Sequence, residues 1–121
     1  MVDTAAQDVP GADDRRLESA AELLRALGAP HRLAIVLELA AAPRCVHELV
    51  ERLGISQSLA SQHLRILRTA GLVTGTRRGK ETLYAIADDH VVHIARDALT
   101  HGSEPRRIRD VPVPTEEEHR P

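Results

Sequence analysis

Imidazole and carboxylate side chains recur on one face of a helix expected near the end of the chain. At 100° per residue, His90, His93, Asp97, His101 and Glu104 all fall on that face. Such groups supply the nitrogen and oxygen ligands that zinc accepts in proteins. The stretch therefore predicts an amphipathic helix with a polar stripe that could bind a metal ion.

The length of this helix decides which ligands can share an ion. His90 and His101 are eleven residues apart, about 16 Å along a straight helix, so they cannot meet within one chain. If two copies pair antiparallel about a two-fold axis, Asp88 and His90 of one chain lie beside His101 and Glu104 of the other. Each of the two resulting sites has two nitrogens and two carboxylates. This set suits four-coordinate zinc, with cobalt as a substitute and nickel less well suited.

The same stripe has an ordinary alternative as a solvated helix face. Exposed polar positions are common and need no ligand. Val92, Ala95 and Leu99 lie on the opposite side, as in an amphipathic helix, and Asp88 with Asp89 can cap the helix start. From this helix alone, the metal site and the solvent face both remain open.

Length and composition favour one small domain that gains from a partner subunit. The chain has 121 residues with no Phe or Trp, and Tyr84 is its only aromatic residue. A thin aliphatic core is stabilised by burial against a second copy. The single cysteine, Cys45, excludes a disulfide framework and favours a cytoplasmic setting. Neither a signal peptide nor a membrane span is expected.

Charge is segregated along the chain, although the formal net charge is only −2. Residues 44–80 contain seven basic residues against two glutamates, a local net charge of +5, so the remainder sums to −7. A basic middle in an acidic chain indicates a polyanionic partner such as DNA.

Helical periodicity predicts four helices in the first part of the chain. The first spans residues 17–27, the second starts at Pro30, and the third spans residues 46–53 with Gly54 as its stop. Ser56 is a suitable N-cap for the fourth. Two short helices around a glycine turn predict a helix-turn-helix.

The fourth helix has a polar face that fits base reading. Gln suits adenine edges, Ser makes adaptable hydrogen bonds, and Arg contacts guanine or phosphate. The predicted DNA-binding residues on this face are Gln57, Ser58, Ser61, Gln62, Arg65 and Arg68. His63 lies on the apolar side and is expected to pack inside the domain.

Two β-rich runs follow, at residues 72–74 and 82–86, around a basic glycine-bearing loop. This pattern is typical of a hairpin. Beside a helix-turn-helix it would act as a wing that places Arg77, Arg78 and Lys80 against DNA phosphates or the minor groove. The expected fold class is mainly α with a small β-hairpin, a dimeric winged helix-turn-helix.

The two ends of the chain are expected to be disordered. Residues 1–14 form an acidic arm with four aspartates, and residues 105–121 form a Pro-rich acidic tail. Residues 15–104 are then the DNA-binding and dimerisation domain.

This order of elements resembles the ArsR/SmtB family of metal-responsive winged-helix repressors over about residues 17–104. The most family-like strings are residues 44–49, 58–64 and 88–104. Zinc sensors of the family carry Asp-x-His, ten residues, then His-x-x-Glu or His-x-x-His on the terminal helix. Asp88, His90, His101 and Glu104 match that spacing without a gap. The resemblance therefore favours the zinc site over the solvent face.

The resemblance implies an apo homodimer that binds a roughly palindromic operator and represses genes for metal efflux or sequestration. Zinc at the dimer interface would weaken DNA binding. The alternative is a winged-helix regulator that does not sense metal. A zinc enzyme uses similar ligands, but the sequence offers no candidate nucleophile and no glycine-rich phosphate loop, so no enzyme is expected.

Some members of the family bind metal near the start of the third helix, through a cysteine there and Cys or His from the N-terminal arm. Cys45 matches that position, yet residues 1–30 contain neither Cys nor His. Residues 45–47 are also not the Cys-x-Cys pair of arsenic sensors. Cys45 is therefore expected to be a small buried residue, and His31, His47 and His119 have no evident partner in the sequence.

Overall fold

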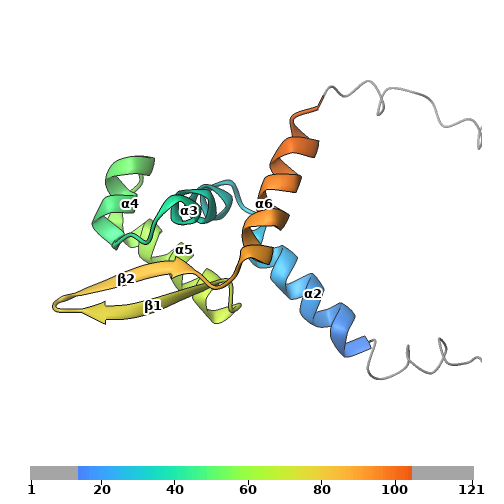
Figure 1. Ribbon diagram of the computed structural model, residues 1–121, viewed down its shortest axis with the longest axis horizontal. Helices are drawn as coiled ribbons and strands as arrows, with labels where there is room; N and C mark the ends of the chain where they lie inside the picture. The colour runs from blue at the N-terminus through green and yellow to red at the C-terminus, as the bar shows by residue number, and fades with distance from the viewer. Residues whose placement is uncertain (1–13, 105–121) are drawn as a thin grey trace, which may run out of the picture.

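The computed structural model describes residues 14–104, which form helices around one small core with a two-stranded hairpin at the edge (Figure 1). The order of elements is α2 (Asp14–Leu27), α3 (Pro30–Ala41), α4 (Val46–Leu53), α5 (Gln57–Thr69), β1 (Val73–Arg78), β2 (Glu81–Ile86) and α6 (Asp89–Gly102). The predicted winged helix-turn-helix is confirmed. The predicted arm and tail lie outside the described residues, except Asp14, which begins α2.

Local signals fix the ends of the helices. Pro30 occupies the first turn of α3, where a missing backbone N–H costs nothing. Gly54 ends α4 in the left-handed region at φ 68° and donates its N–H to the Val50 carbonyl. The Ser56 hydroxyl then accepts a hydrogen bond from the Leu59 N–H at 3.1 Å. The resulting short turn sets the angle between α4 and α5.

The hairpin is longer than the sequence indicates. β1 and β2 pair antiparallel from Val73 opposite Ile86 to Arg78 opposite Glu81. The expectation of a loop over residues 75–80 is wrong, because cross-strand pairing continues to Arg78 and leaves only Gly79 and Lys80 in the turn. Gly79 has a φ of 63°, which a glycine adopts without steric cost.

The core lies between α3, α4, α5 and α6. Its fully buried side chains include Ile35, Leu49, Leu64 and Leu67, and burial of one such side chain contributes about 1.5 to 3 kcal/mol. The hydrophobic cluster continues through Leu72, before β1, to Val91 and Ala95 of α6. Because these elements are separated in sequence, burial of this cluster holds α5, the hairpin and α6 in one unit.

The buried face of α6 differs from the expected one. Val91 and Ala95 are buried, whereas Leu99 is 53% exposed and Val92 only half-buried. Of the three apolar residues expected on the side opposite the polar stripe, only Ala95 is therefore fully buried within the single chain. The helix is rotated so that Leu99 remains at the surface, as do Leu17 and Leu24 on α2. In Figure 1, α2 and α6 lie at the end of the molecule opposite the wing.

Candidate nucleic-acid interface and metal centre

The outer face of α5 presents polar side chains to solvent as predicted from its periodicity. Its apolar residues Ala60, Leu64 and Leu67 are buried in the core. This packing fixes the helix rotation and turns the opposite face outward. The exposed residues of that face are Gln57, Ser58, Ser61, Gln62, Arg65 and Arg68. They form a surface that can donate and accept hydrogen bonds at base edges and phosphates.

The wing supplies a second basic surface beside α5. Arg77, Arg78 and Lys80 are all exposed, and α5 packs against β1. Arg68 lies where the two surfaces meet, because a methyl group on Gly75 would come within 3.0 Å of its guanidinium. The basic surfaces of α5 and the wing are therefore adjacent.

The four predicted metal ligands form two exposed pairs near opposite ends of α6. At the start, Asp88 accepts a hydrogen bond from the His90 N–H at 2.8 Å and also lies 3.2 Å from Nδ1 of His90. At the end, Nδ1 of His101 lies 3.8 Å from the Glu104 carboxylate. The predicted cap at Asp88 is confirmed. The structure brings ligands together within each pair but does not join the pairs within the chain.

The remaining polar residues of the α6 stripe, His93 and Asp97, are exposed between these pairs. Each pair offers one imidazole and one carboxylate, which is half of a tetrahedral site. The side chains of His90 and His101 are 91% and 87% exposed, so both can reach a ligand outside the chain.

His63 packs against the domain and does not join the exposed polar face of α5, as expected, although it is only partly buried. Its Nδ1 lies 3.2 Å from Nη1 of Arg32, and its ring centroid lies 5.5 Å from that of His31. Burial lowers the pKa of His63 below its ordinary value of 6.5, and electrostatic interactions with Arg32 and His31 lower it further. His31 thus has a partner that the sequence did not reveal.

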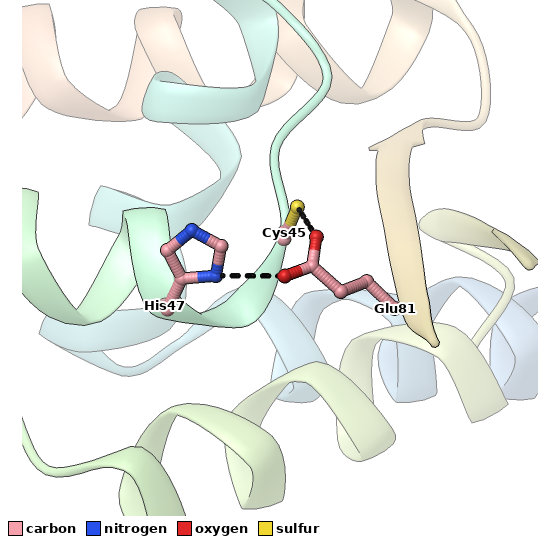
Figure 2. Close-up of side chains that lie close together, drawn as sticks. All are labelled: Cys45, His47 and Glu81. Atoms are coloured by element: carbon pink, nitrogen blue, oxygen red, sulfur yellow. Dashed lines mark hydrogen bonds and ion pairs between the residues drawn. The ribbon is translucent and has the colours of Figure 1, made fainter. Parts of the chain in front are cut away.

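A second group of metal-type ligands joins α4 to the wing (Figure 2). The Cys45 thiol donates to the Glu81 carboxylate at 3.0 Å, and the other carboxylate oxygen lies 3.3 Å from Nδ1 of His47. The hydrogen bond to Glu81 raises the pKa of the Cys45 thiol to about 11. Cys45 is only partly buried, so the expectation of a buried cysteine is wrong. Sequence spacing gave no signal for Glu81, which lies 36 residues from Cys45.

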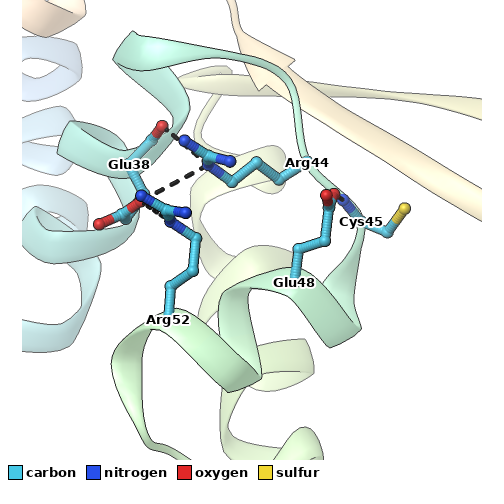
Figure 3. Close-up of polar contacts among 5 residues, drawn as sticks. All are labelled: Glu38, Arg44, Cys45, Glu48 and Arg52. Carbon is cyan, nitrogen blue, oxygen red and sulfur yellow. Dashed lines mark hydrogen bonds and ion pairs between the residues drawn. The ribbon is translucent and has the colours of Figure 1, made fainter.

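Neighbouring arginines hold the segment before α4 in place (Figure 3). Glu38 of α3 forms ion pairs with Arg44 and Arg52. The Cys45 N–H donates to the Glu48 carboxylate at 2.8 Å, which lowers the pKa of Glu48. Arg44 and Arg52 therefore have structural partners although they belong to the basic block.

Among the described helices, none combines the length and apolar character required to cross a bilayer. Two hollows lie along α5: Ser61 and Arg65 line both, and one also includes Arg68 and Tyr84 of β2. These linings hold donors suited to an anionic polymer.

Comparison with known proteins relates the chain to bacterial regulators. Residues 29–74 match the family described as "Bacterial regulatory protein, arsR family". The chain is 58% identical over 88 residues to the HTH-type transcriptional repressor SmtB of Mycobacterium tuberculosis, covering 73% of this chain and 65% of that protein. It is 38% identical over 89 residues to the HTH-type transcriptional regulator NmtR of the same organism, covering 74% of each.

A solved structure shows the same fold. It is the homodimeric winged helix-turn-helix DNA-binding domain of a possible ArsR-family regulator from Mycobacterium bovis. The TM-score is 0.71 at 27% identity, covering 78% of this chain and 88% of that chain.

The chain spans only 65% of the length of SmtB, but 74% of NmtR. The relatives are named as transcription regulators, in agreement with the expectation that the chain is not an enzyme. The matched residues include α3, α4 and α5 and reach the start of β1. This chain belongs to the ArsR family of bacterial regulatory proteins.

Proposed function

We propose that this chain is a metal-responsive transcriptional repressor that binds operator DNA as a homodimer in the cytoplasm. The observation that carries the proposal is the placement of two half-sites, Asp88 with His90 and His101 with Glu104, near opposite ends of one exposed helix. An antiparallel pair of α6 helices completes both half-sites at once.

Exposed apolar residues support dimerisation through α2 and α6. Leu17, Leu24 and Leu99 are 67%, 55% and 53% exposed, and large apolar side chains at a surface favour a partner surface. The two helices lie away from the wing (Figure 1). A dimer formed there would keep both α5 helices free for DNA, in successive major grooves of a roughly palindromic operator.

The donor set at α6 fits a zinc-type ion. Two imidazole nitrogens and two carboxylates satisfy tetrahedral coordination, and no thiolate is required. Zinc would supply a bond between the two α6 helices, and cobalt or nickel are the competing ions. A change in dimer geometry that separates the α5 helices would weaken DNA binding, and DNA would weaken metal binding by the same factor.

DNA contact would come from the outer face of α5 and from the wing. Gln62 and neighbouring polar residues read base edges, whereas Arg77, Arg78 and Lys80 neutralise phosphates. The genes controlled would serve metal efflux or sequestration, as the family resemblance implies. The competing function is a winged-helix regulator whose α6 stripe is only a solvated face.

Fluorescence anisotropy with an operator-length duplex tests the proposal. Zinc should weaken DNA binding of the parent protein about tenfold or more, equivalent to about 1.4 kcal/mol of coupling. His90→Ala/His101→Ala should bind DNA like the parent without zinc and lose the response. His93→Ala, on the same helix face, is the matched control and should retain it. An unchanged affinity with zinc would establish the metal-independent regulator instead.

A further inference from the structure

Cys45, His47 and Glu81 form a ligand group at the start of α4 and the start of β2 (Figure 2), and this group shares no residue with the proposed α6 site. One ligand atom from each residue lies within 4.8 Å of the others. The group combines a thiol, an imidazole and a carboxylate, which are the three side-chain types that zinc accepts. We propose that these residues form a second, intrachain binding site for a zinc-type divalent cation, and this proposal stands independently of the α6 site.

The distances between the ligand atoms suit a tetrahedral ion. Zinc bonds of about 2.0 Å to nitrogen or oxygen and about 2.3 Å to sulfur place ligand atoms about 3.2 to 3.7 Å apart. The observed separations are 3.0 Å from Sγ of Cys45 to Oε1 of Glu81 and 3.3 Å from Nδ1 of His47 to Oε2 of the same carboxylate. Because these contacts use different oxygens of Glu81, a rotation of its carboxylate and small adjustments of the other two side chains are needed to bring one ligand atom of each residue around an ion. A water molecule would complete the fourth position.

The backbone holds the ligands in this arrangement before any ion binds. Arg44 and Tyr84 exchange backbone hydrogen bonds of 3.0 and 2.8 Å, which fix the residue before Cys45 beside β2. Glu48 anchors the Cys45 N–H from the first turn of α4. Glu81 begins β2, and its register opposite Arg78 is set by the hairpin. Such a site loses little conformational entropy when it binds an ion.

The ligands are accessible to solvent. The side chains of His47 and Glu81 are 63% and 50% exposed, and Cys45 is partly exposed. They line one hollow together with Gln57 of α5 and Lys80 of the wing turn. An ion bound there clamps the wing to the start of α4, next to two residues that we assign to DNA contact.

Cobalt(II) spectroscopy distinguishes this site from the α6 site, whose ligands contain no sulfur. Reduced, oxygen-free His90→Ala/His101→Ala protein is titrated with Co²⁺ alone while the thiolate-to-cobalt absorption is recorded. This absorption should saturate at one equivalent per chain, and Cys45→Ser should abolish it. Glu81→Gln and His47→Gln should each weaken Co²⁺ binding tenfold or more.

The matched control is Glu51→Gln, which removes a carboxylate charge from an exposed position of α4. It should bind Co²⁺ like its parent, and thermal unfolding of each apo variant verifies folding. Absence of the thiolate absorption, or unchanged affinity in both Glu81→Gln and His47→Gln, would overturn the proposal. Saturation at half an equivalent per chain would also overturn it, because the thiol would then bind an ion shared by two chains. None of these results depends on whether zinc alters DNA binding through α6.

Discussion

Arg44 and Tyr84 form an isolated antiparallel bridge in which each residue donates its backbone N–H to the other's carbonyl, at 3.0 and 2.8 Å. This bridge extends the hairpin by one short segment and joins the wing to the beginning of α4. The position of the wing therefore depends on contacts made by α3 and α4, as well as on its own turn.

Replacement of Glu38 should loosen that junction. Glu38→Gln removes the charge that pairs with Arg44, whose side chain is only 13% exposed, and with Arg52. Loss of a partner for a largely buried charge should lower the free energy of unfolding by about 1 to 2 kcal/mol. Urea denaturation measures this change. Glu51→Gln, at an exposed position, should change stability by less than about 0.5 kcal/mol, and equal effects would contradict the assigned role of Glu38.

Removal of a wing arginine should weaken DNA binding in a salt-dependent manner. Arg78→Ala removes one expected phosphate contact, so the slope of log K against log salt should fall by about 1 for every duplex sequence. Anisotropy titrations at several salt concentrations measure the slope. Arg15→Ala removes an exposed arginine from α2 and should leave the salt slope unchanged. If DNA affinity fell only for the operator sequence, Arg78 would contact bases instead of phosphates.

The environment of His63 should make stability depend on pH. Because its pKa is lowered in the folded state, the unfolded chain binds the proton more readily than the folded chain. The contribution is therefore fully present above pH 6.5 and is lost as pH falls from there toward the folded-state pKa. His63→Gln should flatten the stability profile in this window, as measured by urea denaturation at successive pH values.

The control for His63 is His93→Gln, which changes an exposed ring of α6. It should retain the stability profile of the parent between pH 6.5 and the lower limit of the window. Glu48 also has a lowered pKa, but its contribution is lost below pH 4.5 and is common to both variants. A profile that is identical in the parent and His63→Gln would count against the assigned role of His63.

A charge on the exposed face of α2 should disrupt the proposed dimer. Leu24 is 55% exposed, and Leu24→Glu would place carboxylates from both chains at the interface. The dimer dissociation constant should rise tenfold or more, and operator affinity should fall with it because one chain then binds only one half-site. Sedimentation equilibrium measures the association. Ala41→Glu, at the exposed end of α3, should leave it unchanged; a monomeric parent protein would refute this assignment.

Much of the helical framework could be predicted because its signals are local. Pro30, Gly54 and Ser56 each act on the turn in which they occur, and the structure places α3, α4 and α5 where these residues indicate. The extension of β1 to Arg78 could not be predicted from such local signals. Gly75 is a weak strand residue, so pairing with distant β2 decides the conformation there.

The two candidate metal sites differ in the same way: one follows from local spacing in the sequence, and the other depends on contacts between distant segments. The α6 ligands could be found because helical spacing alone places Asp88 beside His90 and His101 beside Glu104. The role of Glu81 could not, because its approach to Cys45 depends on a backbone bridge and a hairpin register that involve different parts of the chain. Whether the α6 pairs meet across a dimer remains a prediction.

The two-residue turn of the wing has a consequence for insertions and deletions. Residues along a strand alternate between its faces, so a shift of one position in the pairing moves a side chain to the opposite face. Arg78 lies directly opposite Glu81, with Gly79 and Lys80 between them. One added or removed residue that shifted this pairing would turn Glu81 away from Cys45 while retaining the positive charge of the wing. The length of the turn can therefore determine whether the Cys45 thiol and the Glu81 carboxylate lie together, although neither residue is changed.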